Sequence, residues 1–113
     1  DTISKVKAII GNSKKVAVHL DSNHTHDHVL NELKIYSPLV GVGQYLICGD
    51  TVIEDMPNQD HRPRPWGKGN NPQTALNEYL RQDNVVNQFK LDQKLASKLL
   101  ISNQKKGYLL RIS

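Results

Sequence analysis

Apolar residues recur along this chain with two spacings, and the contrast between them separates predicted strands from predicted helices. An alternating run over residues 16–20 and a nearly unbroken apolar run over residues 44–48 indicate strands, the second buried on both faces. Between them lies a predicted helix that ends near Ser37, with apolar residues at helical spacing: Val29, Leu33, Tyr36 and Val40. Strand, helix and strand within about thirty residues predict a parallel βαβ unit with a right-handed crossover.

The remaining periodic segments are shorter. A helix is predicted over residues 2–11, with Ile3, Val6, Ile9 and Ile10 on one face. Another is predicted to start at Pro72, capped by Asn71, with a buried face of Ala75, Leu76, Tyr79 and Leu80. Short strands are predicted over residues 89–92, 99–102 and 108–112, the last after a turn at residues 104–107. The chain is therefore predicted to be a single α/β domain, with parallel core strands and an antiparallel C-terminal hairpin.

Composition narrows the functional classes. A chain of 113 residues with 37% hydrophobic and 23% charged residues fits one globular domain. No apolar run approaches the roughly 20 residues of a membrane span, and no signal peptide opens the chain, so a cytoplasmic location without membrane attachment is expected. The chain starts at Asp1 and its only methionine is Met56, so we expect a piece of a longer protein.

The net charge of +4 is dispersed. The basic residues lie in small groups without the interleaved aromatic residues of a nucleic-acid platform, at Lys14 with Lys15, Arg62 with Arg64, and Lys105 with Lys106. The expected partner is therefore a small molecule rather than a nucleic acid, and a homo-oligomer is compatible with the sequence. The single Cys48 lies inside an apolar run, which predicts a buried and inert thiol.

Two acidic residues follow the two predicted parallel strands. Asp21 comes at the exit of the first strand, and Asp50 at the exit of the second. Carboxyl ends of neighbouring parallel strands meet at one edge of a sheet, so both side chains are predicted to face one crevice, where ligands bind. Two carboxylates there could hold a hard divalent cation with positions left for water and substrate. The alternative is structural: Asp21 caps the next helix and Asp50 only ends a strand.

Three histidines follow Asp21, and helical spacing separates them. His24 and His28 would share a helix face that His26 does not, so at most two could bind one ion, and a zinc hydrolase is not expected. The run resembles the metallo-β-lactamase motif HxHxDH only superficially, because it is one residue short. His26 and His28 are interpreted as a solvated helix start. His24 is predicted to face the crevice with Asp21 as a catalytic residue, as a base or a hydrogen-bond donor.

Residues 52–70 form a long polar segment that contains cations, prolines and the only tryptophan. A loop of this length in a small domain is more often functional than idle. One interpretation is a lid over an anionic or sugar-like substrate, which Arg62 and Arg64 would contact and Trp66 would stack on. The other is a surface loop whose Trp66 packs on the domain.

The ordered series of motifs resembles the cephalosporin hydroxylase family, which is allied to the rhamnosyl O-methyltransferases. The matching strings are LDSNHTHDHVLNEL at 20–33, SPLV at 37–40, GDTVIED at 49–55, RPWGKGNNP at 64–72, KLLIS at 98–102 and GYLLR at 107–111. The resemblance covers nearly the whole chain. It implies the C-terminal half of a Rossmann-like class I methyltransferase sheet, with the fourth and fifth strands followed by an antiparallel sixth and seventh.

The same resemblance implies an S-adenosylmethionine-dependent O-methyltransferase acting on a sugar or secondary-metabolite hydroxyl, with cofactor-binding residues upstream of Asp1. It implies a magnesium ion held by Asp21 and by an acidic pair, of which Asp50 is the second member. Gly49 stands where the first member is expected, so the ligand role could pass to water, Glu54 or Asp55. Gly49 also leaves open a second hypothesis, a catalytically degenerate family member that serves as a binding or assembly module.

Overall fold

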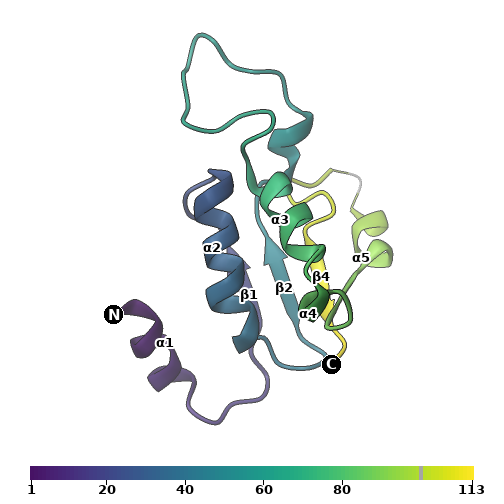
Figure 1. Cartoon of the computed structure of the whole chain (residues 1–113). Coiled ribbons are helices and arrows are strands. Elements are labelled where there is room, and N and C mark those ends of the chain that lie inside the picture. Colours follow the sequence, from purple (N-terminus) through teal and green to yellow (C-terminus); the bar gives the residue numbers. More distant parts are fainter. Residues whose placement is uncertain (100) are drawn as a thin grey trace.

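The chain folds as a four-stranded mixed sheet with helices packed on it (Figure 1). The computed structural model describes residues 1–99 and 101–113. The strands are β1 (Val18–Leu20), β2 (Tyr45–Cys48), β3 (Phe89–Leu91) and β4 (Tyr108–Arg111), in the spatial order β1-β2-β4-β3. Strands β1 and β2 are parallel, whereas β4 is antiparallel to both of its neighbours. The predicted α/β class, with a parallel pair and an antiparallel C-terminal hairpin, is confirmed.

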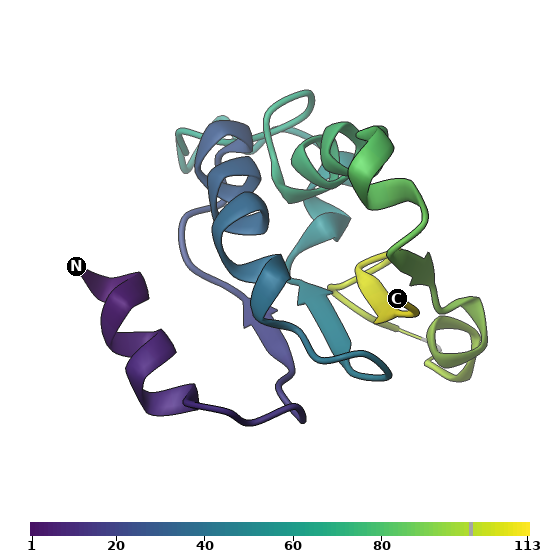
Figure 2. The same ribbon diagram turned by 60° about the horizontal axis from the view of Figure 1, so that its bottom comes forward.

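Two helices cover one face of this sheet. Helices α2 (His26–Tyr36) and α3 (Pro72–Leu80) lie side by side above the strands (Figure 2). The core between them and the sheet consists of Leu20, Val29, Leu33, Val40, Leu46, Cys48, Ala75, Leu76, Tyr79, Val85, Phe89 and Leu109. Inside it, the hydroxyl groups of Ser37 and Tyr79 share a hydrogen bond that joins the end of α2 to α3. The predicted βαβ unit over residues 16–48 is therefore present.

The second strand is less buried than its apolar sequence suggests. Leu46 and Cys48 are fully buried, whereas Tyr45 and Ile47 on the alternate positions are only half-buried. Successive side chains of a strand point to opposite faces. The predicted burial of residues 44–48 on both faces is wrong, because α2 and α3 cover only the face of Leu46 and Cys48.

Helix α3 begins where its sequence predicts. Asn71 has an extended backbone, and its side-chain oxygen accepts hydrogen bonds from the N–H groups of Gln73 (2.9 Å) and Thr74 (3.1 Å). The Thr74 hydroxyl in return accepts from the N–H of Asn71 at 3.1 Å. Reciprocal capping satisfies donors that a helix start leaves unpaired. The predicted cap and start are confirmed.

The structure differs from the sequence-based prediction near both ends of the chain. Helix α1 (Thr2–Ile10) forms as predicted, but none of its residues is buried, and Ile9 is 86% exposed. The predicted strand over residues 99–102 is wrong for residues 99, 101 and 102, and Leu100 lies outside the described residues. The Asp92 side chain instead accepts from the N–H of Leu95 (2.8 Å) and starts helix α5 (Gln93–Lys98), which carries the chain out of the sheet.

Three short helical segments complete the fold. They are the 3-10 turns η1 (Ser37–Leu39) and η2 (Thr51–Asp55) and the single-turn helix α4 (Asp83–Val86). The η2 turn follows β2 directly, and the loop of residues 56–70 leads from it to α3. No helix among residues 1–99 and 101–113 is both long and apolar enough to cross a membrane.

Candidate functional site

Three polar side chains converge where β1 and β2 end. Asp21, His24 and Asp50 each offer a ligand atom within 4.8 Å of the others. His24 Nε2 is hydrogen-bonded to Asp50 Oδ2, and it lies 3.8 Å from Asp21 Oδ1. Asp21 and Asp50 come together at the strand ends with His24 between them, as predicted. The single crevice that was predicted is not found, because Asp50 and His24 line one hollow whereas Asp21 lines another beside β1.

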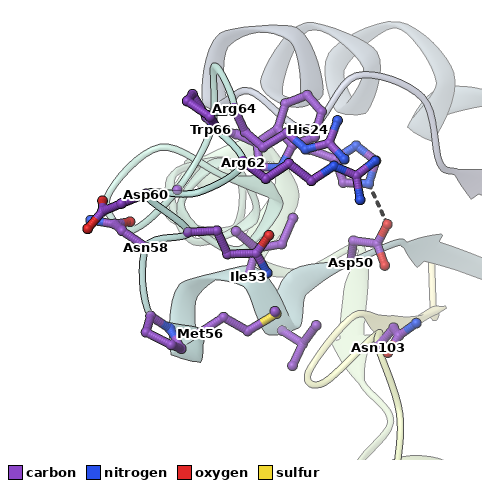
Figure 3. Close-up of a pocket in the computed structure, with 15 residues that line it drawn as sticks. His24, Asp50, Ile53, Met56, Asn58, Asp60, Arg62, Arg64, Trp66 and Asn103 are labelled. Carbon is purple, nitrogen blue, oxygen red and sulfur yellow. Dashed lines mark hydrogen bonds and ion pairs between the residues drawn. The ribbon is translucent and has the colours of Figure 1, made fainter.

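The sheet register brings these residues together. Leu20 and Cys48 are opposite one another in the parallel ladder, and the N–H of Gly49 donates to the carbonyl of Leu20 at 2.9 Å. Both strands therefore end at the same level. Asp50 then adopts a left-handed backbone with φ of 51°, a conformation that Asp tolerates better than most residues. This turn diverts the chain into η2 while the Asp50 carboxylate points toward His24 (Figure 3).

Gly49 is closely packed against the neighbouring strand. A Cβ atom added at this position would lie 2.7 Å from the carbonyl oxygen of Leu20, closer than side chains approach backbone. An acidic residue at position 49 therefore requires the backbone of β1 or β2 to move. The close packing of β1 and β2 thus accommodates glycine at position 49 and not an acidic residue.

The two expected substitutes for that carboxylate are engaged elsewhere. Glu54 is hydrogen-bonded to the side-chain amide of Asn71 and accepts from the N–H of Gly69 at 3.2 Å. Asp55 forms an ion pair with Lys105 at 2.8 Å, which lowers the pKa of the Asp55 carboxyl. The alternative in which Glu54 or Asp55 supplies the missing ligand is not what this geometry shows.

The donor set fits a hard divalent cation bound by two carboxylates. The Asp21 side chain is 55% exposed and that of Asp50 is 29% exposed, which leaves room for water ligands. Among the described residues, Nδ1 of His24 is buried without a hydrogen-bond partner. A metal on Nε2 would force the ring proton onto this unpartnered Nδ1, which is costly. His24 therefore fits better as a donor from Nε2 to Asp50, with Asp21 and Asp50 as the ligands.

A cleft of about 760 Å³ opens beside the His24–Asp50 pair. Its wall on the η2 side is apolar and contains Val52, Ile53 and Met56. The opposite side is formed by the loop, which contributes all three residues predicted to contact substrate: Arg62, Arg64 and Trp66 (Figure 3). The sequence-based interpretation singled out none of four other polar lining residues, because nothing in their local pattern connects them to the strand ends: Asn58, Gln59, Asp60 and Asn103.

Trp66 packs directly on a residue of the site. Its ring stacks on the imidazole of His24, with ring centroids 5.0 Å apart and an interplanar angle of 28°. The guanidinium carbon of Arg64 lies 5.4 Å from the centroid of the Trp66 ring, within cation–π range. The predicted stacking surface is thus partly occupied by His24, and the tryptophan joins the loop to the strand ends.

The interpretation of His26 and His28 as a solvated helix start is wrong for His26. Its Nε2 pairs with Glu78 at 2.6 Å and its Nδ1 bonds the Thr74 hydroxyl at 2.8 Å, so it joins α2 to α3. His28 is 45% exposed and pairs with Glu32 at 3.3 Å on its own helix. Helix α2 starts at His26, so His24 precedes the helix and the helical spacing argument does not reach it.

Two asparagines that the sequence marked only as a turn and a cap hold the loop in place. Asn70 accepts from the N–H of His26 at 2.8 Å and donates to the carbonyl of Pro65 at 3.1 Å. Asn71 is fully buried and donates to the carbonyl of Gly67 at 2.9 Å. The only signal in the sequence was the turn-forming string of residues 67–72. Both residues on either side of Trp66 are therefore fixed by side-chain hydrogen bonds.

The sequence of the chain is similar to known proteins over most of its length. The model of the family "Rhamnosyl O-methyltransferase/CmcI" matches residues 1–112. The rhamnosyl O-methyltransferases of Mycobacterium bovis (strain BCG / Pasteur 1173P2) and Mycobacterium tuberculosis (strain ATCC 25618 / H37Rv) are each 34% identical to the chain over 97 residues. The matched region is 86% of this chain and 36% of each relative, so the chain spans about a third of their length.

No solved structure matches the chain. The family assignment therefore rests on the sequence match over residues 1–112 and on the two relatives, and the resemblance first seen in the ordered motifs is confirmed. The chain belongs to the rhamnosyl O-methyltransferase/CmcI family.

Proposed function

We propose that this chain is the metal- and acceptor-binding half of an S-adenosylmethionine-dependent O-methyltransferase that acts on a sugar or secondary-metabolite hydroxyl. The observation that carries the proposal is the convergence of Asp21, His24 and Asp50 at the strand ends, where His24 and Asp50 also line the cleft. In this proposal the four strands are the C-terminal part of a Rossmann-like sheet. The free edge of β1 would then pair with a further strand of the same sheet, since an unpaired edge is a liability.

The proposed acceptor is a polar small molecule. The relatives are named for transfer to a rhamnosyl group, which makes a sugar hydroxyl the first candidate for this chain. The cleft offers an apolar wall on one side and the guanidinium groups of Arg62 and Arg64 on the other. Such a lining suits a ring with an apolar face and with polar or anionic substituents. Arg62, Arg64 and Trp66 are therefore the proposed acceptor-binding residues.

The residues at the strand ends would bind and deprotonate the acceptor. Magnesium held by Asp21 and Asp50 would supply Lewis-acid chemistry that favours ionisation of an acceptor hydroxyl, and S-adenosylmethionine would supply the methyl group. The hydroxyl proton would pass to the Asp50 carboxylate, which His24 would orient through the hydrogen bond at its Nε2. The residues that bind S-adenosylmethionine are expected in the part of the relatives' length that this chain does not span.

Replacing the carboxylates tests this proposal. In the full-length protein, Asp21→Asn and Asp50→Asn should each abolish metal-dependent methyl transfer while leaving the circular dichroism spectrum unchanged. Asp27→Asn is the matched control, because Asp27 is an exposed residue in the first turn of α2 and lies outside the cleft. Methyl transfer that persists in both site variants would overturn the proposed metal role.

A second candidate function is supported by the packing at Gly49. The strand backbone leaves no room for the acidic side chain that the resemblance expects there, which favours a catalytically degenerate binding or assembly module. Calorimetry separates the two functions. The enzyme should bind S-adenosylmethionine, and binding of magnesium should be lost in Asp21→Asn. A full-length protein that binds no S-adenosylmethionine, with or without magnesium, would support the binding or assembly module and contradict the proposed methyltransferase activity.

A further inference from the structure

The His24 ring makes two contacts in the site, a hydrogen bond to Asp50 and a stack with Trp66. Its Nε2 bonds Asp50, whereas its Nδ1 is buried and finds no partner among the described residues. Histidines at reactive sites are usually oriented by a hydrogen bond on each nitrogen, which fixes both the ring plane and the tautomer. Because the ring is attached at Cγ, a single hydrogen bond at Nε2 restricts rotation about the Cβ–Cγ bond only in part. Something other than a hydrogen bond must set the plane of the His24 ring.

The contact that does so is the stack with Trp66. The two rings are nearly parallel, at 28°, and their centroids are 5.0 Å apart. Turning the imidazole about its Cβ–Cγ bond would drive it out of this stack or into the indole. The stack therefore restricts the one motion that the hydrogen bond allows.

Trp66 can serve as a rigid support because its own neighbours are fixed. The Asn70 side chain donates to the carbonyl of Pro65, next to Trp66, and accepts from the N–H of His26, two residues after His24. Gly67 and Asn70 also exchange backbone hydrogen bonds of 3.0 Å in each direction. This clamp couples the position of the indole to the start of α2 at His26.

We infer that Trp66 is a positioning residue, which holds the His24 imidazole in the plane from which Nε2 reaches Asp50, with Asn70 as its clamp. The inference deepens the proposed function, on which its kinetic part rests. It makes the cleft loop part of the proton-handling machinery rather than only a cover for the acceptor.

The test uses Trp66→Phe and Trp66→Leu in the full-length protein. The phenyl ring can keep the stack, whereas the leucine side chain cannot. For methyl transfer, kcat of Trp66→Leu is expected to fall about 10- to 100-fold, because misplacing a reacting group is costly in rate. Trp66→Phe is expected to recover most of this loss in kcat, whereas a rise in KM reports the separate role of Trp66 as an acceptor contact. Val42→Ala, at an exposed turn 63% accessible to solvent, is the control and should leave kcat unchanged.

Nuclear magnetic resonance gives a readout that does not depend on activity. The ring protons of His24 should show an upfield ring-current shift that is reduced in Trp66→Phe and lost in Trp66→Leu. Asn70→Ala should broaden or split the same signals by loosening the clamp. Unchanged His24 signals in Trp66→Phe and Trp66→Leu would overturn the inference, and so would full kcat in a folded Trp66→Leu.

These outcomes separate the inference from the proposed function. If no variant and no parent protein transfers a methyl group, the proposed function fails while the His24 shifts still decide the positioning role. If Trp66→Leu does not fold, the comparison of the parent with Trp66→Phe and Asn70→Ala by the same resonances decides it.

Discussion

Helices α1 and α3 are both nine residues long, and both carry apolar residues at helical spacing, yet they have opposite fates in the structure. Helix α3 buries Ala75, Leu76 and Tyr79 against α2 and the sheet. Helix α1 buries none of its residues. Both begin at a side-chain cap, Asn71 in one case and Asp1 in the other. A periodic pattern thus predicts the helix, but only tertiary partners decide whether its apolar face contributes to the core.

The caps differ in the same way. The Asp1 side chain accepts from the N–H of Ile3 at 3.2 Å and from the Ser4 hydroxyl at 2.7 Å, both exposed and local. Asn71 is fully buried and adds bonds to Glu54 and to the Gly67 carbonyl. The α3 cap therefore ties a helix to the loop that lines the cleft, whereas the α1 cap serves only its own helix.

The largest expected difference in stability is between truncating a buried residue of α3 and truncating an exposed residue of α1. On the chain of residues 1–113, Leu76→Ala should lower the free energy of unfolding by about 2–5 kcal/mol, because a fully buried leucine leaves a cavity. Ile9→Ala should change it by less than about 0.5 kcal/mol, because Ile9 is exposed. Urea denaturation followed by circular dichroism measures both. Equal losses would show that α1 packs on the domain in solution.

The reactivity of Cys48 provides a second comparison of α1 with α3, because Cys48 lies in the core that α3 covers. Burial, with the nearby charges of Glu32 and Asp50, raises the pKa of the Cys48 thiol from 9.0 to about 12. At neutral pH the folded thiolate population should be about a thousandfold below that of the unfolded chain, so a disulfide reagent should label Cys48 mainly through opening. Leu76→Ala should speed labelling and Ile9→Ala should not.

The raised thiol pKa also sets a pH dependence. The folded state favours the neutral thiol, so its contribution to stability is complete below pH 9.0 and is lost as the pH rises through about 12. Labelling at the unfolded-chain rate under native conditions would contradict the burial of Cys48.

Removing the caps should give a smaller difference. Asn71→Ala should cost about 1–2 kcal/mol of unfolding free energy, since it deletes a helix cap and leaves buried partners unpaired. Asp1→Ala should cost about a few tenths of a kcal/mol at most and fray only α1, because exposed helix caps contribute least. Denaturation of both variants provides the measurement, with amide exchange at Gln73 and Ile3 locating the effect. A cost for Asp1→Ala equal to that for Asn71→Ala would break the comparison.

The smallest expected effect concerns α5, which buries no residue but is linked to the sheet. The Tyr45 hydroxyl donates to Asp92 at 2.5 Å and, with the Leu95 N–H, lowers the pKa of the Asp92 carboxyl. The resulting stabilisation is present above the usual carboxyl pKa and is lost as the pH falls through the lowered value. Tyr45→Phe should raise the Asp92 pKa toward its usual range in a carboxyl-carbon titration. An unchanged pKa would show that the bond to Tyr45 does not form.

Much of the fold was predictable because it is periodic. The change from strand spacing to helical spacing over residues 16–48 gave the βαβ unit, and strand ends gave Asp21 and Asp50. What escaped prediction depends on contacts between distant segments. The exposure of α1, the missing strand after Asp92 and the His26–Glu78 pair each depend on packing partners that no local pattern encodes.

For the candidate site, the residues that line the cleft were predictable, but their arrangement was not. Arg62, Arg64 and Trp66 were expected near the crevice from the composition of a long loop, and they do line the cleft. Their arrangement was not predictable, because a loop without periodicity takes its path from individual hydrogen bonds such as those of Asn70. The stack of Trp66 on His24 is of this kind.

The Trp66–His24 stack has a practical consequence. Trp66 is the only tryptophan of the chain, so the indole fluorescence of residues 1–113 comes from one ring in contact with the candidate site. Any ligand that displaces this ring or changes its surroundings alters the emission of the whole chain. Binding of magnesium, of an anionic sugar or of another acceptor can therefore be followed without a label, by the intrinsic light of the residue that borders the cleft.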